Sequence, residues 1–152
     1  MNDKNATGIP WSFWVIGAVT LIWNVMGVIN FFVQMNADTL ASFPESHRAI
    51  IEGRPLWATG GFAIAVFGGA IGCLLLLLRK SAAHSMFIAS LLGVMVTMAH
   101  TLVIASSTID FSPFEILMMI VMPLVVAAFL IGYSTLARSK GWISAPDRRK
   151  HK

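Results

Sequence analysis

Four long apolar segments dominate this sequence and leave few folds open to it. They cover residues 11–35, 56–78, 85–106 and 113–136, and the one charged residue among them is Glu115. A helix needs about 20 apolar residues to cross the hydrocarbon core of a bilayer, which is roughly 30 Å thick. The sequence therefore predicts an all-α fold, a four-helix transmembrane bundle.

The composition supports a membrane protein and excludes two other classes. Charged residues make up 12% of the chain, whereas soluble domains carry about 25%. The mean hydropathy of +0.75 is far too high for intrinsic disorder. A single cysteine excludes a disulfide framework and a Cys-based zinc site. We expect a single integral membrane domain over residues 1–152, with no metal and no cofactor.

Catalytic signatures are missing from the sequence. There is no Walker, GxSxG or HExxH motif, and no apolar segment carries two carboxylates. We therefore expect no catalytic residues and no enzymatic activity.

The Lys and Arg residues fall almost entirely on one side of the predicted membrane. Four spans place both termini and the second loop on the same side, and cytoplasmic loops are enriched in Lys and Arg. Nine basic residues lie on that side: Lys4, Arg79, Lys80, Arg138, Lys140, Arg148, Arg149, Lys150 and Lys152. The opposite side has Arg48 and Arg54. This distribution predicts cytoplasmic termini, and a basic tail over residues 137–152 that contacts the bilayer surface and not nucleic acid.

The first outer loop, residues 36–55, is long enough to hold a short helix. Ser42-Phe43-Pro44-Glu45 resembles Ser112-Pro113-Phe114-Glu115 at the start of the fourth segment. Both combine Ser, Pro and Glu in the order that favours a capped helix start. We expect an amphipathic helix that ends at Gly53 and lies on the outer surface.

Small residues recur along the second segment at four-residue spacing. Such a row lets another helix approach closely, so we predict a helix-packing surface there. The row at four-residue spacing is Gly61, Ala65, Gly69 and Cys73, with Gly68 and Gly72 beside it.

Polar residues line one side of the first and third segments. On the first segment they fall within about 120° of arc at 100° per residue. They are Thr20, Asn24, Asn30 and Gln34 on the first, and Ser90, Thr97, His100 and Thr101 on the third. A polar face does not point into lipid at low cost. It either bonds neighbouring helices or lines a groove for a solute.

Depth along the helices gathers several of these groups in the outer half of the membrane. Glu115 is either a helix cap or a partner for Arg54, Arg48 or His100, and His100 is either bonded to a neighbouring helix or a titratable site residue. The candidate polar pocket comprises Asn24, Asn30, Gln34, Arg54, His100, Thr101 and Glu115.

Several short stretches resemble a known group of proteins. They are Phe13-Trp14-Val15-Ile16, Ile22-Trp23-Asn24-Val25-Met26-Gly27, Met35-Asn36, Glu45-Ser46-His47-Arg48, Gly53-Arg54-Pro55 and Trp57-Ala58-Thr59-Gly60. Together they resemble small bacterial four-span inner-membrane proteins, often labelled "sugar transporter" or uncharacterised. A more distant likeness is to DoxX-type four-helix membrane proteins, some of them associated with quinone-linked oxidoreductases. The resemblance implies a multi-pass protein of the bacterial inner membrane.

Three function classes fit these observations. The first is a non-catalytic accessory or structural subunit of a larger membrane assembly, with other membrane subunits or further copies of itself as partners. The second is a component of a small-solute, sugar-like transporter that works as an oligomer, since four spans are few for alternating access in a monomer. The third is a subunit of a quinone-linked membrane enzyme.

Overall fold

The computed structural model describes residues 8–105 and 111–144, and within them it is a bundle of helices. Four helical stretches in this part of the chain are long and apolar enough to cross a membrane, which confirms the predicted fold class. They are α1 (Trp11–Met35), α4 (Leu56–Leu77), α5 (Ala82–Ala105) and the stretch formed by α6 (Pro113–Ile116), η1 (Leu117–Val121) and α7 (Met122–Ser139).

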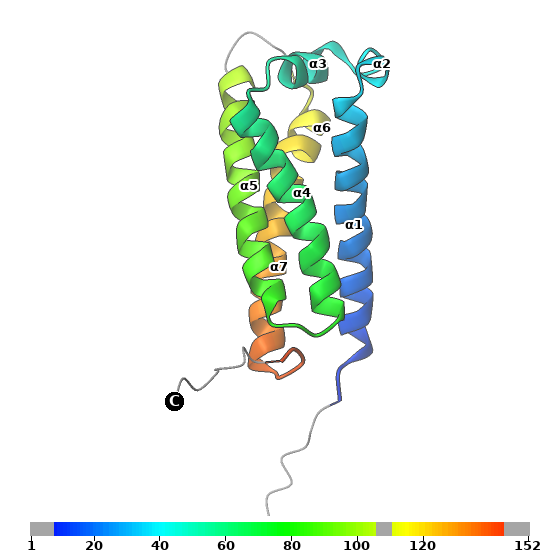
Figure 1. Ribbon diagram of the computed structural model, residues 1–152, viewed down its shortest axis with the longest axis vertical. Helices are drawn as coiled ribbons and strands as arrows, with labels where there is room; N and C mark the ends of the chain where they lie inside the picture. The colour runs from blue at the N-terminus through cyan, green and yellow to red at the C-terminus, as the bar shows by residue number, and fades with distance from the viewer. Residues whose placement is uncertain (1–7, 106–110, 145–152) are drawn as a thin grey trace, which may run out of the picture.

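Two short helices cross one end of the bundle, as Figure 1 shows. α3 (Glu45–Glu52) is the expected surface helix, and it buries Ile50. α2 (Ala37–Leu40) was not expected. Both described ends of the chain lie at the opposite end of the bundle (Figure 1). The charges of Lys4 and of residues 148–152, which supported the predicted orientation, lie outside the described residues.

The two Ser-Pro-Glu starts have different structures. At the fourth span, the Ser112 hydroxyl accepts from the Glu115 amide, and the Glu115 carboxylate accepts from the Ser112 amide at 2.8 Å. This is the capping box that the sequence indicates. The expected similarity at Ser42 is wrong, because α3 begins at Glu45 after an extended Pro44. Ser42 lies too far from that start to cap it and donates to the Thr39 carbonyl at 2.6 Å.

The fourth span contains a π-helical turn, η1, that ends just before Pro123. Proline has no amide hydrogen, and its ring clashes with the carbonyl four residues earlier, here that of Met119. A π-turn is one way in which a helix accommodates such a local disruption.

The backbones of α4 and α5 lie in close contact. A Cβ atom added at Gly93 would lie 2.5 Å from the Gly61 carbonyl oxygen and 2.6 Å from the Ala65 nitrogen. Both are backbone atoms that have no rotamer to change. The predicted row on α4 is buried, and much of it lies against α5: Gly68 lies beside Ser90, and Gly72 beside Phe87.

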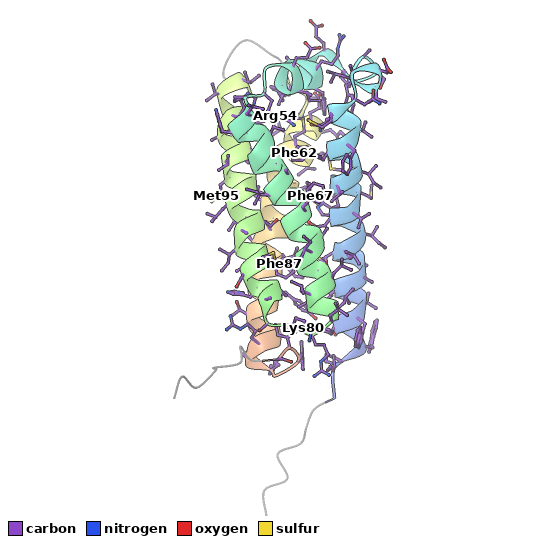
Figure 2. All side chains as sticks on the ribbon, viewed as in Figure 1. Arg54, Phe62, Phe67, Lys80, Phe87 and Met95 are labelled. Carbon is purple, nitrogen blue, oxygen red and sulfur yellow. The ribbon has the colours of Figure 1, made fainter. Side chains whose placement is uncertain are left out.

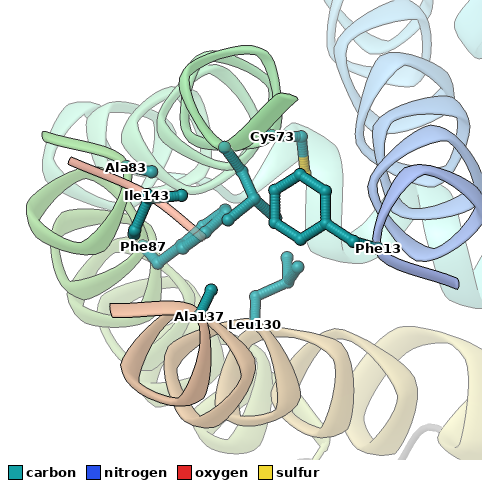
Figure 3. Packing of buried hydrophobic residues seen from close by; sticks show 8 residues of the cluster. Phe13, Cys73, Ala83, Phe87, Leu130, Ala137 and Ile143 are labelled. Atoms are coloured by element: carbon teal, nitrogen blue, oxygen red, sulfur yellow. The ribbon is translucent and has the colours of Figure 1, made fainter. Parts of the chain in front are cut away.

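The segment after α7 folds back under the bundle. Gly141 has a φ of +71°, the left-handed conformation that favours glycine, and it turns the chain after the helix. Ile143 then joins a buried cluster with Phe13 of α1 and Phe87 of α5. Arg79 holds this segment, because its Nε donates to the Trp142 carbonyl at 2.7 Å. Figure 3 shows the Phe13 ring extending into this cluster.

We predict that Gly93→Ala lowers the free energy of unfolding by about 1–3 kcal/mol, the range for overpacking a rigid core. The backbone atoms of Gly61 and Ala65 leave no room for the added methyl group. Denaturant unfolding in mild detergent measures the loss.

The control is Gly132→Ala. An added Cβ at Gly132 has no neighbour within 4 Å, and alanine favours a helix over glycine by about 0.5–1 kcal/mol. Its stability should equal or exceed that of the wild type. Equal stability of the two variants would contradict a backbone contact at Gly93.

Candidate functional site

The polar side chains between the helices form several separate groups. Asn24 of α1, near the middle of the bundle, is 8% exposed. Its Nδ2 donates to the Thr20 carbonyl at 2.8 Å and lies 3.6 Å from the Cys73 sulfur of α4. The Cys73 thiol in turn donates to the Thr20 hydroxyl at 3.6 Å. These contacts join α1 to α4 within the membrane span.

Gly69 provides the space for the Asn24 amide. Any Cβ at this position would collide with Asn24 Oδ1, and it would lie 3.3 Å from Ser90 Oγ of α5. Ser90 itself donates to the Ala65 carbonyl at 2.6 Å. Because Gly69 has no side chain, both α5 and the polar side of α1 can approach α4 at this position.

The threonines of α5 bond their own helix. Thr97 donates to the Gly93 carbonyl at 2.9 Å, and Thr101 donates to the Thr97 carbonyl at 3.1 Å. Threonine satisfies its hydroxyl in this way inside helices. The buried hydroxyls of Thr97 and Thr101 therefore already have an acceptor.

His100 lies under the connection between α3 and α4. It is 5% exposed, and its Nε2 is 3.2 Å from the Gly53 carbonyl oxygen. Because a carbonyl only accepts, Nε2 carries the hydrogen of this bond. The His100 and Trp57 rings lie in a T-shaped arrangement, with their centroids 6.0 Å apart. The buried Nδ1 atom has no hydrogen-bond partner among the described residues.

Glu115 joins the first turn of the fourth span to α3. In addition to its capping role, its Oε1 accepts from the Ser46 hydroxyl at 2.6 Å. The same oxygen lies 3.1 Å from His47 Nδ1, an ion pair when the imidazole is protonated. Among the described residues, this nitrogen has no well-aligned hydrogen bond. The carboxylate is thus both a helix cap and a tie to α3, and its partners are neither of the arginines nor His100.

Arg54 lies between α1 and α4. Its Nη1 donates to Gln34 Oε1 at 2.9 Å, and its guanidinium carbon is 5.0 Å from the centre of the Phe62 ring. Figure 2 shows Arg54 and Phe62 near the end of the bundle that carries α3. The Arg54 Nε atom is buried and has no hydrogen-bond partner in residues 8–105 and 111–144. In the described part of the chain, Arg54 has no carboxylate within ion-pair distance.

The seven residues of the predicted pocket are thus distributed over several places. Gln34 and Arg54 meet, whereas the described contacts of His100 and Glu115 are with other residues. Asn30 is on the exposed side of α1, while His100 is buried against Gly53 and Trp57, so the structure does not pair them. Sequence reasoning missed Ser46 and His47 as partners of Glu115. Their only signal was their place in a surface helix 69 residues away.

We predict that Gly69→Ala and Asn24→Ala are strongly coupled. Gly69→Ala alone should cost about 1–3 kcal/mol of unfolding free energy, because the methyl group displaces the Asn24 amide. In an Asn24→Ala background the amide is gone, so the same change should cost much less. A double-mutant cycle of unfolding in detergent measures the coupling. Equal costs in the two backgrounds would show that the amide does not occupy this space.

Comparisons with known proteins gave no match, so the proposed function rests on the contacts described above. Neither the protein-family models nor the curated proteins gave a match to the sequence, and no solved structure matched the fold. Among the described residues, no three His, Cys, Asp or Glu side chains gather in a way that could hold a metal ion.

Proposed function

We propose that this protein is a non-catalytic accessory subunit of a larger membrane assembly. The observation that carries the proposal is the exposed side chain of Asn30. It lies inside a span of 25 residues, on a face whose other exposed side chains include Met26, Ile29 and Phe32. Within the described chain, no hydrogen bond satisfies its amide.

An amide facing hydrocarbon is costly unless it is bonded. Transfer of an unbonded amide from water to an apolar medium costs roughly 2–7 kcal/mol. Asn30 lies five residues before the end of α1, about 7 Å along the helix axis. Its exposed neighbours are the apolar side chains of Met26 and Ile29. This face of α1 suits a helix of another subunit that presents a hydrogen-bonding side chain to Asn30.

The polar groups inside the bundle support the same proposal. Asn24, Ser90 and the threonines of α5 already bond neighbouring helices or their own backbone. Groups with such partners stabilise a fold, whereas a transport path needs groups that a solute can reach.

A second candidate function is a small-solute transporter component that works as an oligomer. It is favoured by the unpaired Nδ1 of His100 and by the half-exposed Trp57 ring against it. The two candidates differ in what accompanies the purified protein. An accessory subunit copurifies with different proteins, and a transporter component forms a homo-oligomer with a bound solute.

The proposed location is the bacterial inner membrane, with both termini in the cytoplasm and α3 on the outer side. The four spans support a multi-pass membrane protein. The orientation is supported by nine basic residues on the side of the termini against two on the other.

We predict that Asn30→Leu releases the partner subunits while the bundle stays folded. Purification from native membranes in a gentle detergent, followed by mass spectrometry, should show loss of stoichiometric partners and an unchanged unfolding transition. The control is Thr135→Val, which removes an exposed hydroxyl from α7. Full partner retention by Asn30→Leu would refute docking at this face.

The orientation makes a separate prediction. A membrane-impermeant maleimide should label Ser42→Cys in intact cells, because this exposed residue precedes α3. It should label the exposed position of Ser139→Cys only after permeabilisation. Background labelling should be low, because Cys73 is the single cysteine and is buried. The reverse pattern would place the termini outside.

A further inference from the structure

The Arg54 guanidinium lies alongside the helices of the bundle and does not extend away from their end. The residue precedes the first residue of α4 by two positions, but its guanidinium lies over the ring of Phe62. The Cα atom of Phe62 is six residues into α4, about 9 Å along the helix axis from Leu56. Arginines at the ends of spans normally extend toward water. Arg54 instead lies beside the apolar segment.

The neighbours of Arg54 do not neutralise its charge. The Gln34 amide oxygen is a neutral acceptor, and the Phe62 ring gives a weak cation–π contact. In the part of the chain that the structure describes, Arg54 Nε has no hydrogen-bond partner and no carboxylate lies within ion-pair distance of the guanidinium. Burial lowers the pKa of Arg54. A guanidinium nevertheless stays protonated in proteins, so a partly desolvated positive charge remains.

The depth of this charge indicates which anion is available. α1 has 25 residues, which span about 37 Å, more than the roughly 30 Å hydrocarbon core of a bilayer. Gln34 is the penultimate residue of α1, so the guanidinium bonded to it lies near the boundary between the hydrocarbon core and the headgroups. The abundant anion at that level is the phosphodiester of a phospholipid. Arginine is suited to it because its planar fork donates two parallel hydrogen bonds.

Aromatic side chains continue below the guanidinium. Phe62 contacts Phe31 of α1 at a centroid distance of 5.5 Å, and Phe31 contacts Phe67 at 5.8 Å. Phe32 of α1 packs against Phe67 and is 59% exposed. Figure 2 shows Phe62 and Phe67 following Arg54 along α4. Along the bundle, the positive charge of Arg54 is followed by an apolar aromatic surface. A phospholipid has the complementary order, a phosphate headgroup followed by acyl chains.

We propose that Arg54, held by Gln34 and Phe62, binds the phosphodiester of an anionic phospholipid in the leaflet at the α3 end of the bundle. The guanidinium supplies the positive charge and the hydrogen-bond donors. Phe32 and Phe67 contact the acyl chains.

The test uses the full-length protein in mild detergent and three probes. Dioleoylphosphatidylglycerol carries the phosphodiester and the chains, dioleoylglycerol carries the chains alone, and sodium phosphate carries the anion alone. Thermal unfolding and native mass spectrometry report binding. We expect phosphatidylglycerol alone to raise the melting temperature and to remain bound. An equal rise with sodium phosphate would overturn the lipid proposal in favour of a soluble anion, and an equal rise with dioleoylglycerol would overturn the role of the phosphodiester.

Variants assign the effect to the guanidinium. Arg54→Gln should weaken the apparent affinity for phosphatidylglycerol about tenfold or more, the loss expected for a charge-assisted hydrogen bond. The control is Lys80→Gln, which removes one charge at an exposed position at the opposite end, outside the basic tail, and should bind like the wild type. If Arg54→Gln does not fold, Arg54→Lys serves in its place, because it keeps the charge and loses the planar fork. It should bind more weakly than the wild type. Wild-type affinity in the Arg54 variant that folds would overturn the proposal.

Discussion

The backbones of α4 and α5 meet at Gly61 and Gly93 with no side chain between them, and the rest of the bundle is arranged around this contact. In a bilayer, burial of apolar surface gives little drive for helix association, because lipid is as apolar as leucine. Close van der Waals packing and interhelical hydrogen bonds therefore hold the helices together. The bond from Ser90 to the Ala65 carbonyl lies at this contact and depends on the same close approach.

α1 joins this pair by a different kind of contact. Asn24 inserts its amide at Gly69, and Gly17 lies against the Leu77 side chain. At the end of the bundle opposite to α3, Phe13 is fully buried among residues of α4, α5 and α7. These contacts use one side of α1 and leave an apolar face with Asn30 exposed. A helix held on one side in this way can contact a partner subunit without disturbing the contact between α4 and α5.

Local sequence patterns predicted much of the fold. The features that could not be predicted are those that depend on contacts between segments far apart in the sequence. The four spans and the capping box at Ser112 follow from hydropathy and from the spacing of a few neighbouring residues. The cap predicted at Ser42 was wrong, since the same residue types in a shifted order do not fix where a helix begins. Polar faces could be read from helical periodicity, but their pairing depends on helix rotation. The link between Glu115 and Ser46 spans 69 residues, and no local signal indicates it.

Glu115 and Arg54 are two partly buried charges at the α3 end of the bundle, and the protein supplies them with different partners. The Glu115 carboxylate receives hydrogen bonds from Ser112 and Ser46 and lies beside His47, so the protein itself supplies its partners. The Arg54 guanidinium donates to one neutral acceptor, the Gln34 amide oxygen, and lies over the Phe62 ring. A fold that needed Arg54 only to fasten α4 to α1 would do so at lower cost with an uncharged donor, because a neutral hydrogen bond avoids desolvating a full charge. Among the described residues no anion neutralises this charge, and this supports the proposed binding of a phospholipid phosphodiester at Arg54.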